Sequence, residues 1–270
     1  MYGAPFADSS LAARLEAADA QSNVAYVRAK QQIYPASQST WQPIGDGYAV
    51  FTGPNSPINR VHGLGMTQAV TADVLDAATD FYRGRGLRPA IDLCPLAHPT
   101  LVELLRAQGY GAALFKHVLV RTLPDAFDLP AVAPAIRVTQ VEPDQRAYWA
   151  AVVASSFSGS AIDGADIEIP LPNAHKADTT CFLAWLDGEV AGGGALALYD
   201  GTAICFSTAV RPELRRMGVQ SALLHARLTW AQAHSCDLAM VQATPGSASH
   251  RNVERFGFRV AYTKVTTVRG

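Results

Sequence analysis

The stretch that decides the fold covers residues 207–224 and reads STAVRPELRRMGVQSALL. The residues at 203–210 are small, β-branched or apolar, which is typical of a buried strand. Proline at position 212 cannot donate to a strand ladder, so we expect the strand to end there. From Val219 apolar residues recur every three or four positions, which predicts a helix ending near His234. The stretch is therefore predicted to form a strand, a basic turn and a helix.

The turn between this strand and this helix has the chemistry of an anion site. Gly218 can adopt a positive φ, or let another backbone approach closely, at the start of the helix. Unpaired N–H groups of the first helical turn, together with the charges of Arg215 and Arg216, favour a negatively charged ligand. A pyrophosphate would fit there. The alternative is a solvated turn that binds no ligand, in which the glycine only allows the helix to begin.

The stretch resembles the cofactor motif of the GNAT superfamily of acetyl-CoA-dependent N-acyltransferases, in which Gln or Arg is followed three residues later by Gly and five later by Gly or Ala. Arg215 and Gly218 match, whereas Gln220 replaces the small residue. A strand at 238–243, a short helix at 247–255 and Gly257-Phe258 resemble the second cofactor motif. The resemblance implies that acetyl-CoA binds to Thr208, Ala209, Val210, Arg215, Arg216, Met217, Gly218, Val219, Gln220, Ser221, Ser249 and Asn252.

The resemblance also implies the reaction: direct attack of a primary amine on acetyl-CoA in a ternary complex. A base must keep the amine neutral, and the resemblance assigns backbone N–H groups of 208–210 as donors to the thioester oxygen. The tyrosine that often acts as the acid in this superfamily is replaced by Val253, so the acid is unassigned. No base is assigned either; the weak candidates are Glu168, Cys205, Ser207 and His250. A catalytically inactive acyl-CoA-binding module with a regulatory or interaction role is the alternative function.

The first half of the chain repeats the layout of the second. Gly109 and Gly257 hold equivalent places, 257 − 109 = 148 residues apart. With this offset the expected strands and helices coincide over about 50 residues. We therefore predict an α/β (α+β) fold of two GNAT-like domains, each a mixed, mostly antiparallel sheet flanked by helices. The alternative is that the match is accidental, because some offset will align part of any two α/β halves.

The predicted boundaries place a degenerate GNAT-like domain at 1–122, a proline-rich linker at 123–134 and the acetyl-CoA-binding domain at 135–270. With the offset of 148, the basic turn maps onto 67–72, which contains neither arginine nor glycine. We therefore expect one acetyl-CoA per chain, and binding by residues 134–270 alone. The first domain is expected to close the acceptor side with Asn59, Arg60 and His62.

Periodicity and turn residues predict the remaining elements. In the first half these are helices at 11–34, 71–82 and 98–107, and strands at 45–51, 58–66, 89–93 and 110–120. In the second half they are a strand at 136–141, a helix at 144–156, a hairpin of 181–186 with 190–199, and a last strand at 259–268.

Composition limits the class of partner. Lysine and arginine total 22 against 23 acidic residues, a net charge of −1, so neither nucleic acid nor a membrane is expected as a partner. The four cysteines lack paired spacing, which favours buried thiols of a cytoplasmic protein over a metal site or disulfides. The N-terminus has no signal-peptide pattern. No metal is predicted, and a homodimer is left open.

The acceptor is expected to be a small-molecule or peptide amine. The segment 158–179, which in this superfamily covers the acceptor, carries Asp163, Asp166 and Glu168. These carboxylates could favour a cationic amine, and the alternative is a solvated loop that also carries His175 and Lys176.

Overall fold

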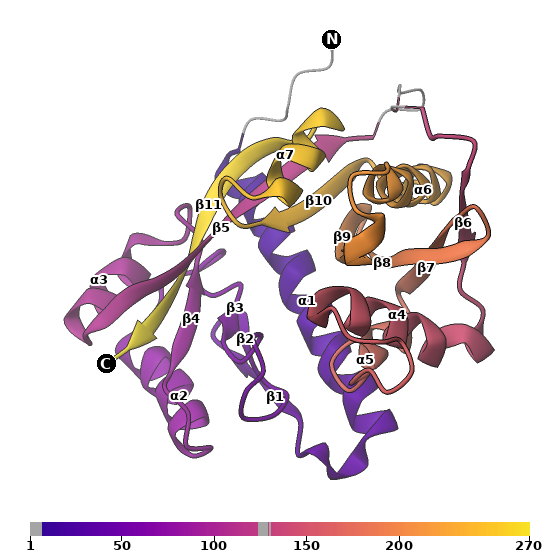
Figure 1. The fold of residues 1–270 in the computed structure, drawn as a ribbon. Coiled ribbons are helices and arrows are strands. Elements are labelled where there is room, and N and C mark those ends of the chain that lie inside the picture. The colour runs from indigo at the N-terminus through magenta and orange to yellow at the C-terminus, as the bar shows by residue number, and fades with distance from the viewer. Residues whose placement is uncertain (1–6, 124–128, 130) are drawn as a thin grey trace.

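A computed structural model describes residues 7–123, 129 and 131–270 (Figure 1). The first half contains α1 (Ser9–Ile33), β1 (Thr40–Ile44), β2 (Gly47–Phe51), β3 (Val61–His62), α2 (Ala72–Arg83), β4 (Ala90–Leu93), α3 (Pro99–Ala107) and β5 (Tyr110–Thr122). The second half contains β6 (Ile136–Gln140), α4 (Arg146–Ser158), α5 (Leu171–Ala174), β7 (Thr179–Leu186), β8 (Glu189–Tyr199), β9 (Thr202–Val210), α6 (Val219–Ala233), β10 (Leu238–Ala243), α7 (Ala248–Arg255) and β11 (Arg259–Arg269).

The elements confirm most of the sequence-based expectations. The offset of 148 carries α2 onto 220–231, where α6 spans Val219–Ala233, and carries α3 onto 247–255, where α7 spans Ala248–Arg255. Two strands differ. β1 was not predicted, because Pro43 lies inside it, and the sheet tolerates this proline because β1 is an edge strand. The strand expected at 58–66 is only two residues long.

The eleven strands of the described residues form one sheet, in the order β1-β2-β3-β4-β11-β5-β10-β9-β8-β7-β6. The last strand of each half is exchanged. β11 lies between β4 and β5, and β5 lies between β11 and β10 (Figure 1). The predicted linker at 123–134 therefore does not divide the sheet; of that linker, 124–128 and 130 lie outside the described residues.

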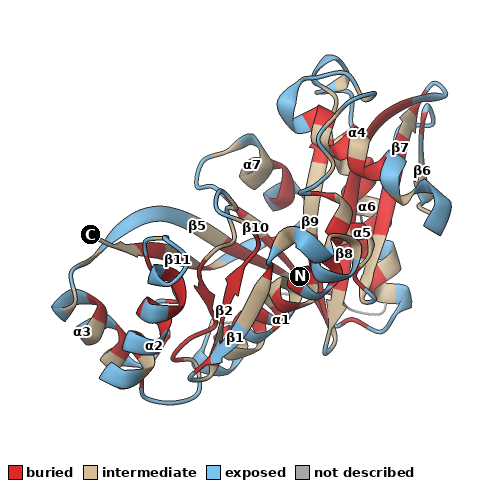
Figure 2. Ribbon diagram, turned by 90° about the horizontal axis from the view of Figure 1, so that it is seen from below, coloured by how far each residue is buried: buried red, intermediate tan, exposed pale blue. Residues whose placement is uncertain are grey.

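The exchange makes the two cores share strands. Side chains alternate across a strand, so Val118 and Val120 of β5 enter the core of the first half, while Leu119 enters that of the second. Tyr262 of β11 packs into the first core. Figure 2 shows β10 as largely buried and the first part of β5 as exposed, and α2 and α3 alternate buried and exposed segments.

Helix α1 joins the two halves. The Asp8 carboxylate accepts from the Leu11 backbone N–H and caps the helix. The helix runs through the middle of the molecule (Figure 1) and contacts β1, β2 and β3 as well as α5, β8 and β9. Among the described residues, no helix combines the length and apolar composition that crossing a bilayer requires.

Candidate active site

A bulge in β9 opens the sheet at the predicted cofactor motif. Ala195 pairs with Phe206 and Gly193 with Ala209, so Ser207 and Thr208 oppose one residue of β8. Ser207 has a φ of 47°, a left-handed conformation that is uncommon for serine. The parallel pairing of β9 with β10 runs only from Thr202 to Cys205. Beyond Cys205, this edge of β9 has no strand partner in the part of the chain that the structure describes.

The turn before α6 has the expected form. Gly218 precedes the helix with a φ of 87°, and a Cβ there would lie 3.4 Å from Ile136 Cδ1. The Arg215 side chain donates to the carbonyls of Val210 (3.2 Å) and Ser156 (3.0 Å), so it ties the turn to α4. Arg216 is exposed, with a φ of 67°, and Met217 is exposed beside it.

A small cavity behind this turn brings several predicted cofactor residues together. Thr208, Gln220, Ser249 and Asn252 all line it, together with Cys205, Leu224, Arg227, Val241 and Val253. Asn252 is buried; its Oδ1 accepts from Ser221 Oγ (3.4 Å), while its Nδ2 has no hydrogen-bond partner within the described residues. An orphaned buried donor fits a polar ligand. Ala209 and Val219 are buried in the core and offer only backbone groups.

A larger pocket of about 320 Å³ lies between the two halves. We call it the inter-half pocket; its lining residues are Asp19, Ser22, Asn23, Tyr26, Ser56, Pro57, Ile58, Ile169, Asn173, Ile204, Cys205, Phe206, Ser207 and Gln242. One face of α1 supplies its first wall, since Asp19, Ser22, Asn23 and Tyr26 follow helical spacing. Residues 204–207 of β9, at the start of the bulge, form a second wall. The pocket therefore needs both halves.

The residues expected to close the acceptor side are not the ones that line it. The neighbouring loop contributes Ser56, Pro57 and Ile58 instead. Asn59 binds its own loop, accepting from the Thr52 N–H (2.9 Å) and donating to the Gly53 carbonyl. The Arg60 and His62 side chains are buried in the first half. His62 belongs to β3, a two-residue strand in which both residues are buried, and Arg60 directly precedes it.

The acidic segment 158–179 reaches the inter-half pocket through uncharged residues. Ile169 and Asn173 line it, whereas Asp163, Asp166 and Glu168 do not. Glu168 Oε1 lies 2.8 Å from the Nζ of the buried Lys30, so its charge is used in an ion pair with α1. The carboxylate that lines the pocket is Asp19 of the first half.

The weak base candidates fall in different places. Cys205 and Ser207 line the inter-half pocket, and burial raises the pKa of the Cys205 thiol, which keeps it protonated. Glu168 is paired with Lys30. His250 Nδ1 accepts from the Gly246 N–H (3.1 Å), and its Nε2 lies 3.5 Å from Glu254. Glu168 and His250 do not line the inter-half pocket, and a protonated Cys205 thiol cannot act as a base.

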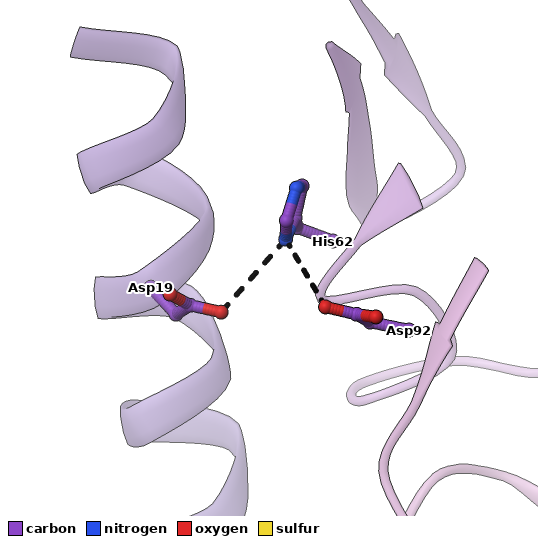
Figure 3. A group of neighbouring side chains, drawn as sticks. All are labelled: Asp19, His62 and Asp92. Carbon is purple, nitrogen blue, oxygen red and sulfur yellow. Dashed lines mark ion pairs between the residues drawn. The ribbon is translucent and has the colours of Figure 1, made fainter. Parts of the chain in front are cut away.

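Behind Asp19 lies a buried charge cluster. His62 Nδ1 is 3.8 Å from Asp19 Oδ2 and 3.6 Å from Asp92 Oδ2, and Figure 3 shows the imidazole between the two carboxylates. The three ligand atoms are close enough together to hold a metal ion. The chain's own cations already occupy the carboxylates, since Lys264 Nζ lies 2.8 Å from Asp19 and Arg60 contacts Asp92 (3.2 Å). The cluster is therefore an ion-pair network.

The pKa shifts in this cluster follow from the balance of burial and charge. Burial alone would raise the pKa of Asp19, but Lys264 and His62 outweigh it and hold this pKa well below its usual value. Burial alone would lower the pKa of Lys264, but Asp19 and Glu16 outweigh it and raise this pKa. Burial raises the pKa of Glu16 despite Lys264. Asp19 and Lys264 are therefore charged in the fold.

Sequence reasoning missed two buried cations beside the bulge. Arg227 of α6 donates to the carbonyls of Leu223 (2.9 Å), Ala195 (3.3 Å) and Phe206 (3.4 Å), so it supports the bulged backbone. Lys176, between α5 and β7, is only 4% exposed, and its Nζ lies 2.7 Å from Ser22 Oγ. The signal for Arg227 was a charge inside an apolar helical face. Lys176 gave no local signal, because its partners come from distant parts of the sequence.

Comparisons with known proteins agree with this architecture. Residues 142–258 match the Acetyltransferase (GNAT) family. A GCN5-related N-acetyltransferase from Kribbella flavida is similar in structure, with a TM-score of 0.67, 17% identity, and coverage of 96% of this chain and 95% of that one. A tandem GNAT protein from the clavulanic acid biosynthesis pathway gives a TM-score of 0.65, 14% identity and coverage of 96% and 93%. No curated protein matches the sequence.

Proposed function

We propose that the protein transfers an acetyl group from acetyl-CoA to a primary amine held in the inter-half pocket, because residues 142–258 match the Acetyltransferase (GNAT) family and the chain shares its fold with a tandem GNAT protein. The proposal includes direct attack of the amine in a ternary complex. It also includes a cytoplasmic setting, which agrees with four free, buried cysteines. Neither nucleic acid nor a membrane is part of the proposal.

One observation carries it: the small cavity and the inter-half pocket both lie against β9 next to its bulge. Cys205 lines both cavities, Thr208 lines the first, and Ser207 lines the second. Ligands on the two sides would thus lie against neighbouring residues of the same strand. Bringing two reactants to one point is the main requirement of a bimolecular transfer.

The chain's residues have separate tasks in this reaction. The first turn of α6, with Gly218, would receive the pyrophosphate, and Asn252 offers a free donor to the rest of the cofactor. Backbone N–H groups of the bulged segment 208–210 would stabilise the oxyanion. When bound, acetyl-CoA supplies the activated thioester. The pocket volume of about 320 Å³ favours a small molecule.

The test is release of free thiol from acetyl-CoA in the presence of small primary amines such as putrescine, tyramine and benzylamine. We expect release with the wild-type protein and a loss of at least tenfold with Gly218→Asp, which puts a carboxylate at the phosphate site. Gly86→Asp is the matched control, because Gly86 also has a positive φ (70°) and open space but lies at the end of α2. It should release thiol at the wild-type rate.

The alternative function, an acyl-CoA-binding module without turnover, predicts a different result. Acetyl-CoA would raise the melting temperature of the wild-type protein, and no amine would release thiol. The observation that favours this alternative is Val253, a buried apolar residue where the superfamily's acid is usual. Absence of both thermal stabilisation and thiol release would remove both functions.

A further inference from the structure

We propose that Ser22 and Lys176 form a relay that accepts the proton lost by the acceptor amine, a step that rests on the function proposed above. Ser22 belongs to α1 of the first half and Lys176 to the second half. The relay would therefore bridge the two halves beneath the inter-half pocket. It would also supply the base that the sequence leaves unassigned.

Lys176 is buried without a counter-charge. Its Nζ lies 2.7 Å from Ser22 Oγ and 4.6 Å from the centroid of the Phe206 ring. Among the described residues, no carboxylate lies within ion-pair distance of this nitrogen. Other buried lysines differ, since Lys30 pairs with Glu168 and Lys264 with Glu16. A buried ammonium that has only a hydroxyl and an aromatic face as partners favours its neutral form.

The position of the pair matches a proton path. Ser22 lines the inter-half pocket together with Phe206 and Ser207, at the beginning of the β9 bulge. Its hydroxyl can accept a proton from a group in the pocket while it passes its own proton to Nζ. Lys176 itself does not line the pocket, so it acts through Ser22. The two side chains come from elements more than 150 residues apart in sequence, and only the packing of α1 against the second half joins them.

The electrostatics support the geometry. Burial lowers the pKa of Lys176 to about 8, against smaller opposing effects from nearby acidic groups. The titratable groups that face it or its partner Ser22 are Asp178 and Cys181 from the β7 side, Asp19 from α1 and Tyr199 from β8. Burial raises the pKa of Cys181 to about 12, so this group is a neutral thiol. A base with a pKa near the working pH is the most effective one.

The step balances in atoms and charge. The amine nitrogen attacks the thioester carbon, the N–C bond forms and the C–S bond breaks. The proton of the amine passes to Ser22 Oγ while the hydroxyl proton of Ser22 passes to Lys176 Nζ. CoA leaves as a thiolate and takes a proton from water, and the Lys176 ammonium returns its proton to water. The net products are the acetylated amine and the free thiol.

The test measures thiol release from acetyl-CoA against pH, with the most active amine of the panel. For wild type we expect kcat to rise with pH along a limb near pH 8. Lys176→Met and Lys176→Arg should lower kcat by about 100-fold or more and remove this limb, with the KM for acetyl-CoA unchanged. Ser22→Ala, which leaves the lysine in place, should cause a similar loss. Arginine keeps the charge but does not deprotonate in this range, so it separates proton transfer from charge.

Lys116→Met is the matched control. Burial lowers the pKa of Lys116 as well, but this residue lies on β5, and within the described residues no hydrogen bond joins its side chain to a residue that lines the pocket. Its pH profile should match that of the wild type. The relay is overturned if Lys176→Arg or Ser22→Ala keeps the limb near pH 8, or if their effects are confined to KM.

A second readout does not depend on turnover. A lysine whose pKa is lowered by folding binds fewer protons folded than unfolded, so its contribution to stability grows as the pH rises from about 8 to about 10.5. The difference in unfolding free energy between wild type and Lys176→Met should rise over this window. A flat difference overturns the relay, even if thiol release confirms the transferase. If the wild-type protein releases no thiol with any amine, the proposed function fails and the relay fails with it.

Discussion

The two adjacent arginines before α6 illustrate how a single contact changes a residue's role. Both were expected to act on phosphate. Arg215 donates to the Val210 and Ser156 carbonyls, whereas Arg216 is exposed in a left-handed conformation. Each hydrogen bond of this kind contributes about 0.5–1.5 kcal/mol to stability. Arg215 thus has a structural task that Arg216 lacks.

We therefore predict opposite effects for the two alanine variants. Arg215→Ala should lower the melting temperature by several degrees, because it frees the turn from α4. Arg216→Ala should leave the melting temperature unchanged, raise the Kd for acetyl-CoA and reduce the salt dependence of binding, because it removes only a charge near the pyrophosphate. Thermal denaturation and calorimetric titration at two salt concentrations measure these effects. Early melting of Arg216→Ala with an unchanged Kd would contradict the assignment.

At the residue level, sequence predicts what is local. The turn around Gly218 could be predicted, because its strand, its glycine and its helix are consecutive. Lys176 and Ser22 could not, because their contact joins residues 154 positions apart. The acidic residues of 158–179 were plausible acceptor ligands by composition, but Lys30 of α1 pairs with Glu168. Only tertiary packing decides which charges stay free.

At the level of elements, α1 and β11 are joined by a buried network of charges. Lys264 Nζ of β11 lies 2.8 Å from both Glu16 Oε2 and Asp19 Oδ2 of α1. The Tyr262 hydroxyl donates to Glu16 Oε1 (2.6 Å). One cation thus compensates two buried carboxylates. Removing it leaves charges without partners in the core, which costs more than the ion pairs contribute.

Lys264→Met should therefore destabilise the protein by about 3–5 kcal/mol. The lowered pKa values of Asp19 and Asp92 mean that these groups add stability above their unfolded pKa near 4, and that this stability is lost as the pH falls through the folded values. The wild-type protein should lose stability steeply below about pH 4, and Lys264→Met should lose less, since the charge of Lys264 is the largest of the effects that lower the pKa of Asp19. Urea denaturation between pH 3 and 7 measures both curves. Equal acid slopes would show that Lys264 does not set these pKa values.

The strand exchange is the element-level feature that sequence did not predict. β5 and β11 are equivalent in the repeat, both follow a helix and a glycine, and both alternate apolar residues on two faces. Either strand could complete either half, so local pattern does not distinguish exchange from separate domains. The repeat itself, and the bounds of α2, α3 and β4, could be predicted because periodicity and glycine stops are local signals.

At the scale of the whole molecule, the exchange makes the halves depend on each other. Without residues before 134, β11 loses β4 and β5, its only partners in the described sheet, and β10 exposes an edge. Exposed edges favour aggregation. The inter-half pocket also loses the wall that α1 supplies. The expectation that residues 134–270 bind the cofactor alone therefore conflicts with the observed topology.

The number of cofactor sites follows from comparing the two equivalent helix starts. Before α6 stands a basic turn with Gly218 at a positive φ. Before α2, the Asp46 carboxylate accepts from the Gly65 N–H (2.6 Å), the Thr67 N–H (2.6 Å) and the Thr67 hydroxyl (2.9 Å). In the first half, the Asp46 carboxylate therefore occupies the N–H and O–H donors of this turn. In the second half, the equivalent turn leaves its donors to a ligand. A pyrophosphate there would meet a negative charge and too few donors.

We therefore predict one acetyl-CoA per chain. Calorimetric titration of the full-length protein should give a stoichiometry of one, and Gly218→Asp should remove the binding heat entirely, because we expect no second site to retain it. Gly86→Asp, at the end of α2, should keep both the stoichiometry and the Kd, since its positive φ carries the same conformational cost away from the turn. Two equivalent sites in the wild-type protein, or one site of unchanged affinity in Gly218→Asp, would contradict the prediction and place acetyl-CoA in the first half.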